Sequence, residues 1–335
     1  MAPPQSVLST TLRLLRDKLM DNSFIAHPLI RAIEAQGGVI KVSGGSRVDT
    51  PVIFGDHTSI TELTGAGFNP VSMDVTDPFH TASFEWANFT QPVILSKVEK
   101  AANKGDLAVV NLLESKVNNT MLALRKEVNL QIIRGTSTRI TGLQTLNGST
   151  TAAGTGWLEG VAQASQDSVV GGLSKVTYQA QNWFNQFYDS GGTYDTSHLD
   201  QLMINAQIYS PDGEFPDIIL MSPSCFGAHQ ALIQGAMRYS PGDSEDKGMV
   251  GMWRGARIYI DPNLGFTAES PAKPISAYVL SSANIKLYAD VDGWFEMGDM
   301  LPVPGTAAEA AMVFCRMQLV TGHLASHGVL VDAEA

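Results

Sequence analysis

One amphipathic segment, residues 103–134, constrains the fold of this chain more than any other feature. Its apolar side chains recur every three or four positions, at Leu107, Val110, Leu113, Val117, Met121, Leu124, Val128 and Ile132. Asn103 or Asp106 can cap the start, and Gly135 follows at the expected end. A helix of about 30 residues would be roughly 45 Å long. A coiled coil could use the same stripe, but the flanking positions carry no consistent charge pattern, so we predict that the helix packs against a sheet.

Strand-like segments precede this helix. Residues 81–89 alternate between two faces, one of which carries Phe84 and Trp86, and residues 48–54 can supply the partner strand. The intervening segment is rich in glycine and proline and is too long for an ordinary connection, which is typical of a functional loop. We expect the aromatic side chains of this excursion to be exposed on the isolated chain and covered by neighbouring molecules: Phe54, Phe68, Phe79, Phe84 and Trp86.

The N-terminal residues predict an arm. Four leucines within residues 8–19 lie at helical spacing with basic residues off the stripe, and the glycine-rich run 37–46 predicts a flexible connector. A mitochondrial presequence would use a similar pattern, but Asp17 and Asp21 interrupt the acid-poor composition that it requires. We expect an amphipathic helix docked on the body of the protein or on a neighbour.

The second half of the chain predicts an inserted α/β unit. Ser197 and Asp200 have capping-box spacing, residues 217–221 resemble a short buried strand, and Ser222 followed by proline predicts the start of a helix. Alternating apolar residues return at 311–320 and 328–331. We therefore expect the long helix and these last strands to form one domain, with the α/β unit inserted between them.

The composition limits the classes of protein that this chain can represent. Hydrophobic residues make up 44% of the 335 positions, which excludes a disordered chain, and no apolar run approaches the length of a membrane-spanning helix. The two cysteines cannot form a disulfide framework or a CxxC site, which fits a reducing compartment. Only 16% of the residues are charged, which suggests that other molecules cover much of the surface.

Three short motifs could carry chemistry, and each has a simpler structural interpretation. Asp290 and Asp292 are similar to part of a calcium loop but fit an Asp-Gly turn better. His323 and His327 have the spacing of zinc ligands on a helix but lack an HExxH motif. Ser224 lies at a strand-to-helix turn without the glycines of a nucleophile elbow. We expect no catalytic, cofactor-binding or metal site.

Residues spread over nearly the whole chain resemble the major capsid proteins of tailed double-stranded DNA bacteriophages, which have the Hong Kong ninety-seven type of fold. They are AHPLIRAI at 26–33, FEW at 84–86, GDL at 105–107, GL at 142–143, Trp183, PDIIL at 216–220, GD at 298–299 and GVL at 328–330. Each motif alone is weak, but their order and spacing together are more specific.

This resemblance implies an α+β fold in five segments. They are an N-terminal arm at 1–47, an E-loop hairpin at 48–96, the long spine helix of the P-domain at 97–140, an inserted A-domain at 141–300, and return strands of the P-domain with the C-terminus at 301–335. The resemblance also implies self-assembly as pentamers and hexamers into an icosahedral head in the virion, after assembly in the host bacterial cytoplasm. Its candidate partners are scaffold, portal and decoration proteins and packaged double-stranded DNA, with no membrane.

Two other functions remain open at this stage. An encapsulin-like nanocompartment would use the same fold with protein cargo and no DNA. A soluble α/β hydrolase would use Ser224 as its nucleophile. The net charge of −11 favours a shell that holds DNA, because a strongly basic lining would grip the phosphates.

Charge by segment indicates how neighbouring copies recognise one another. Residues 48–96 contain six acidic residues and no lysine or arginine, whereas residues 97–134 contain seven basic and four acidic residues. We expect the excursion of one copy to dock on the helix domain of the next, a head-to-tail contact that can close rings. The candidate interface residues are Phe54, Phe68, Phe84, Glu85, Trp86, Lys97, Lys100 and Lys104.

Overall fold

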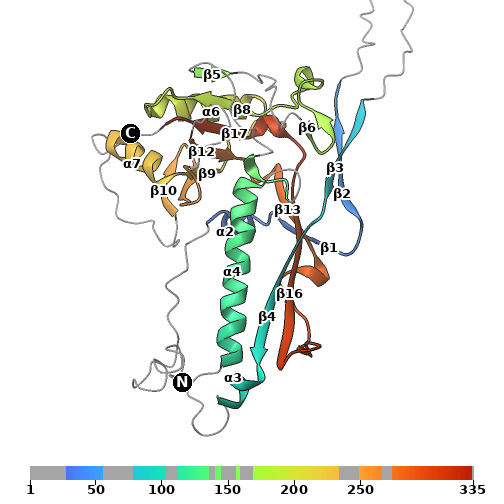
Figure 1. Cartoon of the computed structure of the whole chain (residues 1–335). Coiled ribbons are helices and arrows are strands. Elements are labelled where there is room, and N and C mark those ends of the chain that lie inside the picture. Colours follow the sequence, from blue (N-terminus) through green and yellow to red (C-terminus); the bar gives the residue numbers. More distant parts are fainter. Residues whose placement is uncertain are drawn as a thin grey trace, which may run out of the picture.

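A long helix lying beside a sheet forms one end of the molecule, and a second sheet with its helices forms the other (Figure 1). The computed structural model describes residues 28–55, 78–102, 112–135, 140–144, 156–158, 169–233, 249–265 and 274–333. Helix α4 (Leu112–Arg134) runs along strand β4 (Ala87–Ser96), with Leu124, Val128 and Ile132 buried in the core. The predicted packing of this helix against a sheet is confirmed, and its predicted start at Asn103 or Asp106 lies outside the described residues.

The sheet beside α4 has six strands. Its longest pairing is the antiparallel pair of β4 with β16, which runs without a shift from Ala87 opposite Met317 to Ser96 opposite Ala308. The other strands pair with β16 or with β13, and helix α3 (Lys97–Ala102) continues from the end of β4. The remaining strands are β1 (Val39–Val42), β13 (Ile285–Asp290), β14 (Glu296–Met297), β15 (Leu301–Pro302) and β16 (Ala308–Thr321).

The second sheet has seven strands, and its strands β9, β12 and β17 are buried on both faces. One face packs on helices α6 (Thr196–Ile208) and α7 (Pro223–Ile233), and the other joins the core that contains Val128 and Ile132 of α4. In spatial order the strands are β10 (Met249–Trp253), β11 (Ala256–Ile260), β9 (Ile218–Met221), β12 (Ile275–Leu280), β17 (Gly328–Val331), β8 (Gln186–Asp189) and β5 (Gly156–Leu158).

Strand pairing crosses three of the expected domain boundaries. Strands β13 and β14 fall within 141–300 but pair with β16 in the six-stranded sheet. Strand β17 falls within 301–335 but lies between β12 and β8 in the seven-stranded sheet. Strand β4 falls within 48–96 but pairs along its whole length with β16 of the six-stranded sheet. Alternation identifies a strand, but it carries no information on which sheet that strand joins, so these boundaries could not be read from local pattern.

The predicted strand pair ahead of the helix is confirmed. Strands β2 (Arg47–Ile53) and β3 (Phe79–Glu85) are antiparallel, with Val48 opposite Phe84, and we call this pair the hairpin. A smaller pair, β6 (Val169–Val170) and β7 (Leu173–Ser174), lies against it, and Ser83 N–H donates to the Gly171 carbonyl. A Cβ at Gly171 would lie 2.9 Å from the Ala82 Cβ, so only glycine permits this close approach.

The helix starts were predicted with mixed success. Helix α7 begins at Pro223, and Ser222 Oγ accepts a hydrogen bond from Cys225 N–H, as expected for a cap followed by proline. Helix α6 is capped by Asp195, which accepts from Ser197 N–H, so the predicted capping box of Ser197 and Asp200 is wrong. The Asp200 carboxylate is instead used in a contact with another strand pair, as described below.

One inner helix and three short turns complete the described fold. Helix α2 (Pro28–Ala35) buries Leu29 and Ile33 in the main core, so this part of the expected arm packs on the body of the chain. Short 3₁₀ turns lie at Gln179–Gln181 (η1), Val291–Gly293 (η2) and Leu324–Ser326 (η3). Among the described residues no helix is long and apolar enough to span a membrane.

Candidate assembly surfaces

The inner face of the hairpin is covered by the chain itself. Phe84 is 2% exposed, and Trp86 and Phe54 are 9% and 8% exposed. The Phe54 ring stacks on Tyr178 with centroids 4.6 Å apart and meets the edge of Trp183 at 5.4 Å. The expectation that Phe54, Phe84 and Trp86 are exposed on the isolated chain is therefore wrong. Residues 170–183 pack on Phe54 and Phe84, and the Arg316 guanidinium lies over Trp86. Phe68 lies outside the described residues.

The outer face of the hairpin is exposed and becomes apolar at the end far from the sheet. Ile53 and Phe79 are directly opposite each other in the β2–β3 register and are 64% and 67% exposed. Such a cross-strand pair on a half-buried hairpin normally faces a core or a partner. The exposure expected for Phe79 is confirmed. Ile53 was missed, because the sequence analysis considered only the aromatic side chains of this segment.

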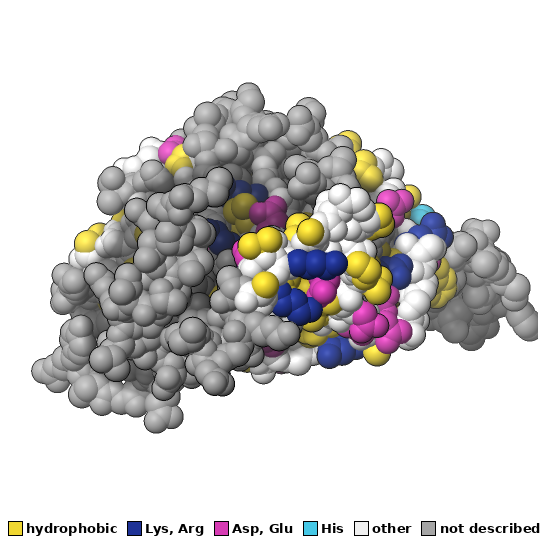
Figure 2. Space-filling model, turned by 60° about the horizontal axis from the view of Figure 1, so that its bottom comes forward, with side chains coloured by type: hydrophobic (Ala, Val, Ile, Leu, Met, Phe, Trp, Pro, Cys, Tyr) yellow, Lys and Arg dark blue, Asp and Glu magenta, His cyan; other side chains and the backbone are white. Residues whose placement is uncertain are grey.

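A second apolar surface lies on the face of the six-stranded sheet that points away from α4. Alternate residues of β4 and β16 point there, and we call the group Pro92, Ile94, Met312 and Phe314, with Leu301 of β15, the outer sheet face. The opposite phase of the same strands, including Val93 and Val313, is buried. Figure 2 shows hydrophobic side chains gathered on the described part of this end, with acidic and basic side chains between them.

The charged candidates divide into paired and unpaired groups. Lys100 Nζ lies 2.9 Å from Glu309 Oε2 of the same chain, so it ties α3 to β16. Lys97 and the Glu85 side chain are exposed. Lys104 lies outside the described residues.

Two acidic groups near these surfaces are held ionised by donors of the same chain. The Asp49 carboxylate has a lowered pKa, chiefly because Ser83 Oγ donates to it and then because Arg47 lies 3.0 Å away. The pKa of Glu99 is also lowered, chiefly by the hydrogen bond from Lys116 at 2.7 Å and then by the Ser96 amide. The acids and bases therefore pair partly within one copy, which the charge count by segment did not show.

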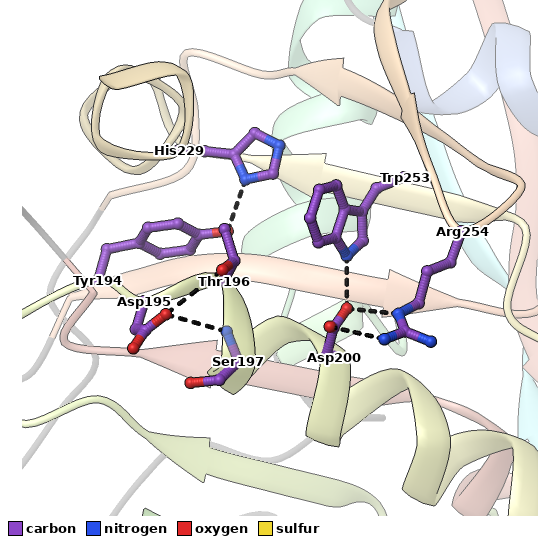
Figure 3. Close-up of polar contacts among 8 residues, drawn as sticks. All are labelled: Tyr194, Asp195, Thr196, Ser197, Asp200, His229, Trp253 and Arg254. Atoms are coloured by element: carbon purple, nitrogen blue, oxygen red, sulfur yellow. Dashed lines mark hydrogen bonds and ion pairs between the residues drawn. The ribbon is translucent and has the colours of Figure 1, made fainter. Parts of the chain in front are cut away.

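A polar cluster fastens the outer end of the seven-stranded sheet to α6 (Figure 3). Arg254 donates from Nε and Nη2 to the two carboxylate oxygens of Asp200, at 2.5 and 2.7 Å, and the Trp253 indole donates to Asp200 at 2.7 Å. Arg254 and Gly255 form the two-residue turn between β10 and β11, and both have positive φ, as a type I′ turn requires. The cluster thus holds the β10–β11 turn against the helix.

Tyr194 and His229 form a separate pair beside this cluster. The Tyr194 hydroxyl lies 2.6 Å from His229 Nδ1. Burial raises the pKa of Tyr194 and lowers the pKa of His229. Both groups are therefore neutral near pH 7 and share one hydrogen bond, which is a satisfied polar pair in a core.

The three short motifs have structural roles. Asp290 Oδ1 accepts from Asp292 N–H in the η2 turn, which confirms the turn interpretation. His323 and His327 flank η3 rather than share a helix face, and His327 accepts from Ser281 N–H at Nδ1 while Nε2 meets Thr321 Oγ1 at 3.1 Å. Ser224 lies in the first turn of α7 with its Oγ 3.2 Å from Ser222 Oγ. These contacts give Asp290, His327 and Ser224 structural roles.

No protein-family model and no curated protein matches the sequence. Solved structures match over almost the entire chain. The capsid of an empty GTA particle has a TM-score of 0.61 at 12% identity, over 99% of this chain and 98% of that one. The capsid of cyanophage A-1(L) has a TM-score of 0.60 at 14% identity, over 98% and 99%.

A third match is an encapsulin. The SrpI encapsulin of Synechococcus elongatus PCC 7942 has a TM-score of 0.60 at 10% identity, over 100% of this chain and 97% of that one. All three proteins form shells, and their subunits match this chain from end to end. The chain therefore has the α+β fold of tailed-phage major capsid proteins, the Hong Kong ninety-seven type, which these shell proteins share.

Proposed function

We propose that this chain is the structural major capsid protein of a tailed bacteriophage and self-assembles as pentamers and hexamers into an icosahedral head around double-stranded DNA. The observation that carries the proposal is the full-length match to capsid subunits in a chain that leaves two apolar surfaces uncovered. Exposed apolar patches of this kind mark surfaces that another molecule covers.

The two uncovered surfaces suggest how copies meet. The hairpin of one copy would lie on the outer sheet face of the next, so that Ile53 and Phe79 contact Ile94, Met312 and Phe314. Different patches then meet in each contact, and such a heterologous contact closes rings when the rotation fits. Glu85 and Lys97 are exposed near these surfaces and would add charge contacts at the rim.

The charge of the chain supports the enclosed cargo that we propose. Its net charge of −11 disfavours tight binding of phosphates, so DNA can be packed inside the shell without binding tightly to its inner surface. Assembly would take place in the host bacterial cytoplasm, with scaffold, portal and decoration proteins as candidate partners. The two buried cysteines are compatible with that compartment.

An encapsulin-like nanocompartment is the second candidate, because one matching structure is an encapsulin complex. The two functions differ in what the shell contains. A phage head protects DNA from nuclease, whereas a nanocompartment contains protein cargo.

Electron microscopy of the purified full-length chain tests the proposal. We expect closed icosahedral shells, and particles recovered from infected cells should protect DNA from nuclease. Particles with co-purifying protein and no protected nucleic acid would favour the nanocompartment. A chain that remains monomeric at high concentration, with and without co-expressed phage proteins, would overturn both.

The sequence also predicts how such shells are held together. Residues 48–96 contain no lysine, so this segment cannot supply the amine for lysine isopeptide cross-links, which occur in some proteins of this fold. Boiling shells in detergent should release monomers near 35.9 kDa. A ladder of covalent multimers would contradict this prediction.

A further inference from the structure

Two side chains of one strand bind the root of the hairpin, by which we mean the end where β2 begins and β3 ends. Arg316 and Gln318 are two residues apart on β16 and so point to the same side. Arg316 Nη2 donates to the carbonyl of Gly45, just before β2, at 2.6 Å. Gln318 Nε2 donates to the carbonyl of Glu85, the last residue of β3. Each strand of the hairpin is thus bonded at its root to a neighbouring position on β16.

Other contacts fix the Arg316 side chain. Its Nη1 donates to Asp290 Oδ2 at 3.0 Å, and the two side chains are only 23% and 11% exposed. The guanidinium also lies over the Trp86 ring, 4.9 Å from the centroid. Trp86 is the single residue between β3 and β4, so Arg316 contacts the chain where it leaves the hairpin as well as where it enters.

Gln318 connects the same root to the end of the long helix. It is buried, and its Oε1 accepts from Thr141 N–H at 3.0 Å while Nε2 also lies 3.3 Å from Thr141 Oγ1. Thr141 follows α4 in the chain. The hairpin root is therefore coupled by hydrogen bonds to the segment that follows the helix.

The backbone at the root can turn when these bonds are absent. Gly44 and Gly45 have φ of +76° and +90°, a region that favours glycine. No added Cβ at Gly44 would meet an atom within 4 Å, so the chain there is not confined by packing. A glycine pair at the base of a strand pair is a hinge whose angle other contacts must set.

We infer that Arg316 and Gln318 form a two-point clamp that sets the angle at which the hairpin leaves the six-stranded sheet. The inference goes beyond the proposed function, because it concerns the single subunit whatever the shell contains. Both are positioning residues, and their removal should change the orientation of the hairpin before it changes the stability of either sheet.

Spin labels on the full-length chain test the clamp. Labels at Thr81→Cys on the hairpin and Val98→Cys on α3 report the hairpin angle, with labelled chains diluted in unlabelled ones. The native cysteines, Cys225 and Cys315, are buried and should not react. We expect a narrow distance distribution in the parent and a broad or shifted one after Arg316→Ala.

Hydrogen exchange supplies a second measurement and a control. Loss of a charge-assisted hydrogen bond at the root should accelerate exchange of the β2 and β3 amides by about tenfold. Exchange in the seven-stranded sheet should stay unchanged. Arg254→Ala removes a similar arginine–aspartate pair at the other end of the molecule and should leave the hairpin distances unaltered.

Conservative variants keep the test decisive if Arg316→Ala does not fold. Arg316→Lys retains a charge beside Asp290 but cannot reproduce the two-nitrogen contact, so we expect an intermediate distance distribution. Gln318→Leu should loosen the hairpin with little change in volume. Parent-like distances and exchange in the folded Arg316 and Gln318 variants, or equal broadening in Arg254→Ala, would overturn the clamp.

Discussion

The two sheets of this molecule differ in how completely one chain covers them. The strands β9, β12 and β17 of the seven-stranded sheet are buried along their whole length, because helices pack on one face and the main core on the other. In the six-stranded sheet, strand β4, and β16 as far as Cys315, are buried only on the side of α4. The chain thus covers both faces of one sheet but leaves part of one face of the other exposed to solvent. This arrangement suits a subunit whose exposed face is covered by other copies of the chain.

This difference predicts that equal substitutions will act differently in the two sheets. Mutations in the seven-stranded sheet, which we call the closed sheet, should affect the folding of the subunit. Mutations on the outer sheet face should affect assembly.

Leucine truncation should show the largest contrast. Leu220 of β9 is fully buried, so Leu220→Ala should lower the free energy of unfolding by about 2 to 5 kcal/mol through lost burial and the cavity left behind. Leu301 of β15 is 65% exposed and is the matched control, since Leu301→Ala should leave subunit stability nearly unchanged. Denaturant titration of both variants measures the difference. Equal losses would show that the two sheets are equally closed.

Acid should destabilise the closed sheet through His327. Burial lowers the pKa of His327 to about 3, from an ordinary value of 6.5. Between these pH values His327 is protonated in the unfolded chain and neutral in the folded chain. The free energy of unfolding therefore falls as the pH drops from about 6.5 towards 3, by up to ~1.4 kcal/mol per pH unit. Above that window this group has no effect.

Unfolding titrations between pH 7 and 4 measure this slope. His327→Gln removes the titrating ring while keeping an amide that can hydrogen-bond, so the slope should become shallower even if the variant is less stable at pH 7. An unchanged slope would assign the acid sensitivity to other groups. His229, whose pKa is also lowered by burial, is then the next candidate in the same half of the molecule.

Local pattern in the sequence was enough to predict the elements but not their partners. The stripe in α4 and the alternation in β3 depend on neighbours three, four or two residues away, so both were predicted correctly. Burial of Phe84 depends on Val170 and Gly171, some 85 residues later in the chain, and was missed. The sheets that β13 and β17 join also depend on residues far away in the chain, so local pattern could not predict them.

The assembly surfaces were partly visible in the sequence. Residues 311–315 are apolar in both phases of the strand, so Met312 and Phe314 in the second phase were a signal of a face covered from outside, but the segment was interpreted only as an alternating strand. Arg316 and Gln318 gave no such signal, because a polar residue in an alternating strand looks like an ordinary exposed position. Their contacts with Gly45 and Glu85 join segments more than 230 residues apart.

The ion pair of Lys100 with Glu309 should contribute little to the subunit. Lys100→Glu places two carboxylates together at the end of β16, and the expected loss is about 0 to 1 kcal/mol because the Lys100 side chain is largely exposed. The exchange variant Lys100→Glu, Glu309→Lys should recover that loss. If assembly slows in the single variant and recovers in the exchange, Lys100 acts within its own subunit. Slow assembly that persists in the exchange would mean that Lys100 meets an acidic group of a neighbour.

The outer sheet face should show the smallest effect on the subunit and a clear effect on assembly. Met312 and Met317 lie on the same strand in opposite phases, one 56% exposed and the other fully buried. Met312→Ser removes little internal packing, since the contact of its sulfur with Thr90 Oγ1 is a weak one of 3.9 Å, so the free energy of unfolding should change by no more than about 0.5 kcal/mol. It does remove an apolar contact from the surface that we assign to the neighbouring hairpin, so shells should form more slowly or at higher protein concentration. Met317→Ser should instead destabilise the subunit itself. Light scattering during assembly, measured beside denaturant titration, separates the two effects, and normal assembly of both Met312→Ser and a Phe314→Ser variant would mean that this face stays open in the shell.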